Sequence, residues 1–157
     1  MNTCTIPTLR PTAMASLALA ALLACGSAWA QFAAAPAAMP AKAQAVSDAA
    51  NDKDYRRDGA RHLYNAYARQ IHKGKMPPLL YGIAIIETEI GAQGEVRNVR
   101  VVRQPAAAEV TPWAVQMIKA AGPFPAPARL GSVRYTEIWL VDKSGRFQLD
   151  TLTEGQH

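Results

Sequence analysis

The stretch that decides the fold is YGIAIIETEIGAQGEVRNVRVVRQPAAAEVTPWAVQMIKAAGPFPAP, residues 81–127. Its first part, residues 81–90, is rich in β-branched side chains and largely alternating, which predicts a strand. Residues 91–94 include two glycines, which favour a tight turn, and residues 95–104 predict a second strand. The stretch therefore begins with a β-hairpin.

The second strand of this hairpin has an irregular apolar pattern. Val96, Val99 and Val101 cannot share one face at a strict period of two, because the step from 96 to 99 is odd. A β-bulge near residues 97 and 98 would bring the three valines to the same face. We therefore expect a bulge in the second strand.

A helix is predicted directly after the hairpin. Thr111 suits the N-cap and Pro112 suits the first helical position. Apolar side chains then recur at helical spacing until the Gly-Pro pair at residues 122 and 123 ends the helix; they are Trp113, Met117, Ile118 and Ala121.

A further helix is predicted before the hairpin. The charged residues 51–58 indicate its solvated start, and Leu63, Tyr67 and Ile71 follow four residues apart on one face. The Pro-Pro pair at residues 77 and 78 lies beyond its expected end near Gly74.

Two strands are predicted after residue 131. Residues 132–141 form the third strand, and residues 146–150 form a short fourth strand behind a turn at 142–145. The fourth strand is expected to pair with the third and to close its outer edge. The sequence therefore predicts an α+β fold, with two helices on one face of a three- to four-stranded antiparallel sheet.

The first thirty residues indicate export. Arg10 is the only charge before Lys42, residues 13–24 are an Ala/Leu run, and Ala28 and Ala30 flank Trp29 as a small-x-small cleavage site. Residues 1–30 are thus predicted to be a signal peptide, with the remaining chain in a bacterial periplasm.

Two alternatives for this segment stay open. Cys25 follows Leu22-Leu23-Ala24, which is close to a lipobox and would make the protein an inner- or outer-membrane lipoprotein or structural factor of the envelope. Residues 13–30 carry no charge and would otherwise serve as an uncleaved anchor. All three alternatives place the folded part outside the cytoplasm.

The chain after residue 30 is long enough for one domain. Residues 31–54 are predicted to be a flexible Ala/Pro-rich linker and residues 55–157 the folded α+β domain. Cys4 and Cys25 leave with the signal, so no disulfide is expected. Removing Arg10 from seventeen basic residues leaves sixteen against twelve acidic ones, a net charge of +4, spread without a sustained basic run. Nucleic-acid binding is therefore not expected.

No catalytic, cofactor or metal site is predicted. His62 and His72 are ten residues apart, which is not a metal-ligand spacing on a helix. Glu87 and Glu89 share one strand face, as an acid–base pair would, but no activating partner accompanies them. We therefore expect a protein without enzymatic activity.

A partner-binding surface is expected on the outer face of the sheet. Ala84, Ile86 and Ile90 are assigned to the helix-covered face, which leaves the intervening residues of the first strand outside. If the aromatic residues of the third strand join that side, the outer face carries an apolar patch. The predicted partner-binding residues are Ile83, Ile85, Tyr135 and Trp139. The alternative is that the linker or the final residues fold over this patch.

Residues 64–141 resemble the C-terminal domain of the TonB and TolA energy-transducing proteins. The resemblance is carried by Pro77-Pro78, by the turn ending at Gly94 before Glu95-Val96, and by residues 99–102. Its most specific part is residues 120–127, AAGPFPAP, where Pro123, Phe124 and Pro125 look like the family's structural signature. Flanking prolines restrict the backbone around Phe124, so its ring is expected to be a structural anchor.

The resemblance implies a three-stranded antiparallel sheet with two helices. It also implies a non-catalytic periplasmic protein that takes part in envelope transport and binds partner strands at a sheet edge. The implied partner is an outer-membrane receptor or an inner-membrane complex component, and a second copy of the chain, forming a homodimer, is the other candidate. The linker of about twenty residues would reach only about 60 Å when extended, which argues against energy transduction across a wide periplasm.

Overall fold

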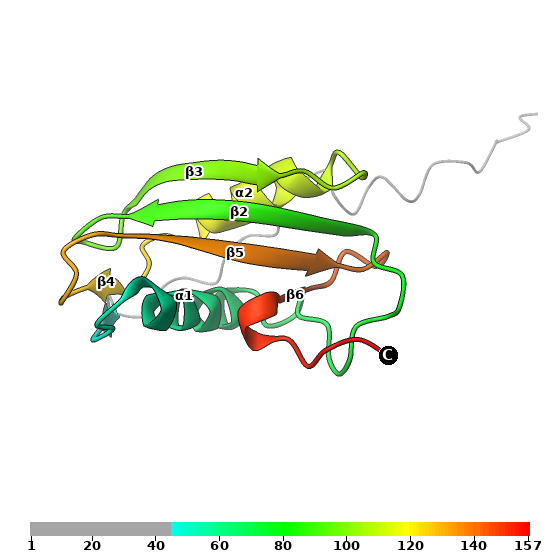
Figure 1. The fold of residues 1–157 in the computed structure, drawn as a ribbon, viewed down its shortest axis with the longest axis horizontal. Coiled ribbons are helices and arrows are strands. Elements are labelled where there is room, and N and C mark those ends of the chain that lie inside the picture. The colour runs from blue at the N-terminus through cyan, green and yellow to red at the C-terminus, as the bar shows by residue number, and fades with distance from the viewer. Residues whose placement is uncertain (1–44) are drawn as a thin grey trace, which may run out of the picture.

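A computed structural model describes residues 45–157 of the protein (Figure 1). The predicted signal peptide, Cys25 and most of the predicted linker lie outside the described residues. The elements in chain order are β1 (Val46–Ser47), α1 (Asp52–Ala66), β2 (Gly82–Ile90), β3 (Val96–Arg103), α2 (Val110–Ala120), β4 (Ala126–Pro127), β5 (Val133–Val141), β6 (Phe147–Leu149) and the 3-10 helix η2 (Asp150–Leu152).

The main sheet has four strands in the order β3-β2-β5-β6, and each neighbouring pair is antiparallel. Figure 1 shows α2 behind β2 and β3, whereas α1 runs alongside β5. A small parallel sheet of β1 and β4 lies apart from it. The predicted α+β class and the antiparallel sheet are confirmed.

An aromatic cluster fills the core between helices and sheet. Trp139 of β5 stacks on Phe147 of β6 with ring centroids 4.8 Å apart, and Trp113 of α2 meets both rings edge-on at 6.2 and 5.8 Å. All three side chains are buried. Offset-stacked and edge-on contacts suit the ring quadrupoles, so this cluster fixes α2 against the β5 and β6 strands of the sheet.

The predicted bulge in β3 is confirmed. Ile90 pairs with Val96 and Glu89 with Asn98, so Arg97 is the extra residue. The register shifts again between Ile85 and Ile86, where an extra residue at position 102 was not expected. A bulge bends its strand and interrupts the ladder, which leaves residues 98–101 as the regular part of β3.

The folded part begins earlier than predicted. Val46 pairs in parallel with Ala126, so residues assigned to the flexible linker belong to an ordered element. The α1 helix starts inside the charged run, because the Asn51 side chain accepts a hydrogen bond of 2.9 Å from the backbone N–H of Asp54. It ends at Ala66, well before Gly74, and the remaining apolar residues belong to turns and a bridge.

The predicted start of α2 is wrong by two residues. The N-cap is Glu109, which makes no side-chain capping bond, and Thr111 lies inside the first turn with its hydroxyl buried. Val110 is completely buried in the core, which favours the earlier start. Pro112 still lies in the first turn, where the backbone N–H groups have no partner within the helix.

Phe124 is completely buried, as expected for a structural anchor. Its backbone N–H donates to the carbonyl of Gly94 at 2.8 Å, and the hydroxyl of Tyr55 donates to the carbonyl of Pro125 at 2.6 Å. The Pro-Phe-Pro segment is therefore held between the hairpin turn and α1.

Candidate partner-binding surface

The prediction that Tyr135 and Trp139 lie on the outer face of the sheet is wrong. Trp139 pairs with Ala84 and Tyr135 with Thr88, and residues directly opposite each other share a face. These positions face the helices, where Tyr135 is 5% exposed and Trp139 is completely buried. Neither side chain is therefore available to a partner.

The outer face retains the two other predicted residues, Ile83 and Ile85. Both are half-buried, and they pair with Leu140 and Ile138 of β5, which are also half-buried. The four side chains form an apolar area at the end of the sheet where β2 begins. We call this area the outer apolar patch.

The other half of the outer face carries ion pairs. Arg100 contacts Glu87 at 3.0 Å and Arg134 contacts Glu89 at 3.1 Å. The hydrogen bond from Arg100 holds the pKa of Glu87 below its usual value. Glu87 is therefore ionised at neutral pH, a state unsuited to a general acid.

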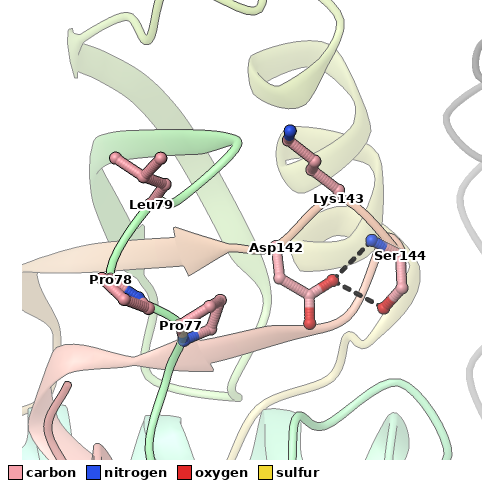
Figure 2. Close-up of a pocket in the computed structure, with 6 residues that line it drawn as sticks. All are labelled: Pro77, Pro78, Leu79, Asp142, Lys143 and Ser144. Atoms are coloured by element: carbon pink, nitrogen blue, oxygen red, sulfur yellow. Dashed lines mark hydrogen bonds between the residues drawn. The ribbon is translucent and has the colours of Figure 1, made fainter. Parts of the chain in front are cut away.

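Leu79 lies between two hollows and is 80% exposed. The first hollow, of about 380 Å³, is shown in Figure 2 and is lined by Pro77, Pro78, Leu79, Asp142, Lys143 and Ser144. The second, of about 410 Å³, lies between the loop before β2 and the end of β3, and Ile83, Arg103 and Gln156 are among its lining residues. The second hollow therefore adjoins the outer apolar patch.

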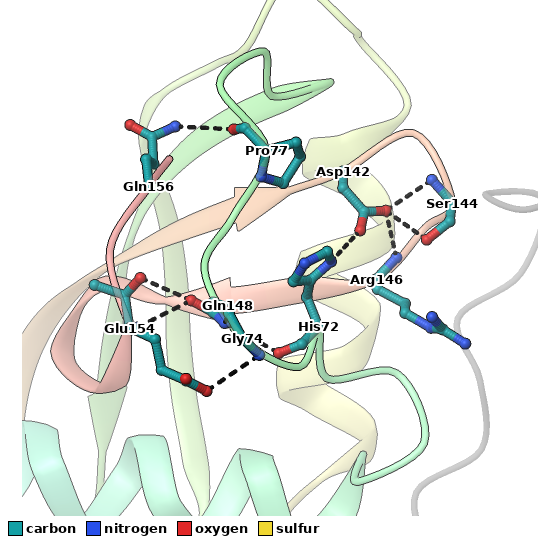
Figure 3. Close-up of polar contacts among 10 residues, drawn as sticks. His72, Gly74, Pro77, Asp142, Ser144, Arg146, Gln148, Glu154 and Gln156 are labelled. Atoms are coloured by element: carbon teal, nitrogen blue, oxygen red, sulfur yellow. Dashed lines mark hydrogen bonds and ion pairs between the residues drawn. The ribbon is translucent and has the colours of Figure 1, made fainter.

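The turn after β5 shapes the first hollow. The Asp142 carboxylate accepts hydrogen bonds from the backbone N–H of Ser144 at 2.7 Å and from its hydroxyl at 2.6 Å (Figure 2). It also accepts from the backbone N–H of Arg146 and lies 2.6 Å from Nδ1 of His72 (Figure 3). Burial would raise the pKa of Asp142, but the hydrogen bonds from Ser144, His72 and Arg146 outweigh it and hold the pKa below its usual value.

This cluster does not have the geometry of a nucleophile and its base. A serine nucleophile must donate its hydroxyl proton toward an imidazole. Here Ser144 and His72 both bind the same carboxylate, Asp142, and the Ser144 hydroxyl donates to that carboxylate. The arrangement stabilises the turn.

The β6 side of the sheet is closed by the chain itself. The predicted pairing of β6 with β5 is confirmed, with Trp139 opposite Leu149. On its other side, Phe147 donates its N–H to the carbonyl of Gln70 at 3.0 Å and accepts from the N–H of His72 at 2.9 Å. The buried Gln148 side chain also donates to the carbonyl of Gly74 at 2.7 Å (Figure 3).

The β3 edge is open over the part of the chain that the structure describes. No strand among residues 45–157 pairs with the outer side of β3. Val102 is 49% exposed, and Arg97, Asn98 and Arg103 are also exposed. Arg97 and Arg100 have carboxylate partners, whereas Arg103 forms no ion pair with any described residue.

Sequence reasoning missed Leu79 and Arg103. The available signal for Leu79 was an apolar pair, Leu79-Leu80, placed after two prolines and outside any predicted strand. The two prolines before it donate no backbone hydrogen bond and favour a loop, so an exposed position for Leu79 fits this context. For Arg103 only its place at the end of an edge strand would have indicated a role.

Among residues 45–157, no helix is both long enough and apolar enough to cross a membrane. Within the same residues, no group of histidine, cysteine and acidic side chains is arranged to hold a metal ion.

The resemblance to the TonB and TolA C-terminal domains rests on the sequence motifs alone. No protein-family model, no curated protein and no solved structure matches this chain.

Proposed function

We propose that the protein is a non-catalytic, exported protein-binding module of the bacterial cell envelope, of the type of the TonB C-terminal domain. Its partner is an envelope protein that takes part in transport, either an outer-membrane receptor or a component of an inner-membrane complex. An extended segment of the partner adds as a further strand beside β3.

The difference between the two sheet edges carries this proposal. The β6 side is occupied by residues 70–72, while the β3 side presents unpaired backbone groups. Unpaired groups on an edge strand are the usual template for strand addition. The bulges limit the regular ladder to residues 98–101, so the added strand pairs with this short segment.

The charge of β3 defines the chemistry of the partner segment. The strand contains Arg97, Arg100 and Arg103 and no acidic residue. Arg103 has no ion-pair partner among the described residues and lines the second hollow, beside Ile83. A partner segment with an acidic side chain opposite Arg103 and an apolar side chain entering this hollow fits both features.

Site-specific photo-crosslinking in intact cells tests the proposal. A photoreactive residue is placed at Asn98 in one variant and at Val102 in another. Each variant is expected to give one crosslinked adduct, and the two adducts should have the same mass. The exposed helical positions Arg61 of α1 and Lys119 of α2 are the matched controls and should give none. Equal adducts from the helical positions, or none from β3, would contradict strand addition.

The charge of the partner is tested separately. Arg103→Glu is expected to reduce the adduct yield from Val102, because it places a carboxylate opposite an acidic partner. Arg129→Glu changes the charge equally at an exposed position outside β3 and should leave the yield unchanged. An adduct with twice the mass of the chain would identify the partner as a second copy.

A further inference from the structure

A third hollow, of about 370 Å³, lies apart from the β3 edge. Its lining includes three cationic side chains, Arg69, Lys73 and Arg146, together with His72. The same hollow is lined by Ala68 and Ile71, and no acidic residue lines it. We call it the basic hollow.

Backbone pairing holds the two sides of the basic hollow together. Arg69 and Lys73 belong to the segment after α1, and Arg146 precedes β6. Ile71 forms a parallel bridge with Phe147, next to Arg146, which fixes the two segments side by side. The N–H of Arg146 also donates to the Asp142 carboxylate at 3.2 Å, while its side chain extends away from that carboxylate (Figure 3).

The cationic side chains have no counter-charge of their own. Among the described residues, Arg69, Lys73 and Arg146 take part in no ion pair. Two carboxylates close to this segment have other partners: Asp142 binds the turn and His72, and Glu154 accepts from the backbone N–H of Gly74, with N and O 3.3 Å apart. Like charges around one hollow repel each other, and a bound anion would remove this repulsion.

His72 adds an oriented ring nitrogen. A carboxylate accepts hydrogen bonds only, so Nδ1 of His72 must be the donor toward Asp142 at 2.6 Å. This leaves Nε2 for a ligand, as an acceptor from a protonated phosphate oxygen while the ring is neutral and as a donor when the ring is protonated. Fixing one ring nitrogen by a carboxylate is a common way to orient the other.

We propose that the basic hollow, lined by Arg69, His72, Lys73 and Arg146, is a binding site for a phosphate group. Two guanidinium groups and one ammonium group suit a tetrahedral phosphate group, which offers several acceptor oxygens in different directions, better than a planar carboxylate with two. The phosphate group belongs either to a free phosphate compound or to an anionic phospholipid headgroup. The site is independent of the proposed strand addition at β3.

Titration of the purified protein with inorganic phosphate tests the site, with the nuclear magnetic resonance signals of the His72 ring as the readout. Saturable shifts are expected. Arg146→Gln and Arg69→Gln should each weaken binding by about tenfold, because each removes a charge-assisted contact. Arg129→Gln is the matched control, since it removes one exposed arginine outside the hollow. All these residues are exposed, so melting curves should match that of the wild type.

Two further measurements separate the ligands. Vesicles containing phosphatidylglycerol are compared with phosphatidylcholine vesicles in a sedimentation assay. If the wild-type protein sediments with phosphatidylglycerol vesicles and the Arg146→Gln variant does not, the site binds a lipid headgroup. If the protein binds phosphate but does not sediment with these vesicles, the site binds a free phosphate compound. The second measurement is a titration with acetate in place of phosphate. Acetate that binds as tightly as phosphate would overturn the proposal, as would the absence of both phosphate and vesicle binding. Equal weakening by Arg129→Gln would also overturn it, because net charge alone would then explain the binding.

Discussion

Arg56 of α1 and Glu137 of β5 form an ion pair across the helix–sheet interface, with Nη2 and Oε1 2.8 Å apart. The Glu137 side chain is 3% exposed, and the same oxygen accepts from the N–H of Ile138 at 3.0 Å. Arg56→Met would leave a buried carboxylate without its cation, so we expect a loss of about 3 kcal/mol in the free energy of unfolding. Chemical denaturation measures this loss.

A double variant provides the control for this ion pair. Arg56→Met combined with Glu137→Gln removes both charges and is expected to recover part of the loss. Glu137→Gln is measured alone for comparison. If the stability loss of the double variant equals the sum of the losses of the two single variants, the two side chains are not energetically coupled.

Phe124→Ala should destabilise the protein strongly. The ring is completely buried, and its loss would leave a cavity between the hairpin turn and α1. We expect a cost of about 3 to 5 kcal/mol, measured by denaturation. Leu79→Ala is the matched control, because its side chain is 80% exposed and its loss should change stability by less than about 0.5 kcal/mol.

Gly94→Ala is expected to be more harmful than Gly131→Ala. Both glycines have positive φ, 77° and 67°, so each alanine pays about 1 to 2 kcal/mol of backbone strain. A Cβ at Gly94 would also lie 2.0 Å from the carbonyl oxygen of Phe124, whereas nothing lies within 4 Å at Gly131. Thermal melting that ranks the two variants equally would contradict the close approach of the hairpin turn to Phe124.

The depressed pKa of Asp142 should make the free energy of unfolding depend on pH. Its folded-state pKa is depressed, so its contribution is present above the unfolded value near 3.8 and is lost as the pH falls through the folded value. Asp142→Asn should therefore cost stability at about pH 7, and the difference from the wild type should shrink below about pH 4. Denaturation of both proteins across this range measures it. A difference that stays constant would show that the charge of Asp142 contributes nothing.

The N-terminal segment predicts a defined processing product. Cleavage after Ala30 would give a mature chain that begins at Gln31, because small residues flank Trp29 after the apolar run. Mass spectrometry of the protein isolated from the periplasm tests this. An acylated product beginning at Cys25 would instead identify a lipoprotein.

The sequence predicted those parts of the fold that depend on strong local signals. The hairpin follows from β-branched alternation around a turn with two glycines, and the bulge follows from the odd step between Val96 and Val99. The pairing of β6 followed from the short turn at residues 142–145. In each case, neighbours in the chain decide the outcome.

The face of β5 was predicted wrongly because both of its faces carry apolar residues. Tyr135 and Trp139 alternate with Ile138 and Leu140, so hydrophobicity alone does not distinguish the two sides. Volume would have helped, because the largest apolar side chains of β5 all lie on the buried side. The basic hollow could not be predicted from the sequence. Arg146 is far from Arg69 and Lys73 in the chain, and only the bridge between Ile71 and Phe147 brings the two segments together.

The small β1–β4 sheet fixes residue 45, the first described residue, at one end of the domain. Residue 45 enters beside Ala126, near the end of the sheet that carries the turn between β2 and β3 (Figure 1). Figure 1 shows that β2 begins at the opposite end. Leu79, which lines both hollows, lies just before that strand in the chain. Because β2 has nine residues, the two ends are separated by roughly 30 Å. A domain held at residue 45 would thus present Leu79 at the other end of the sheet, roughly 30 Å from the point of attachment.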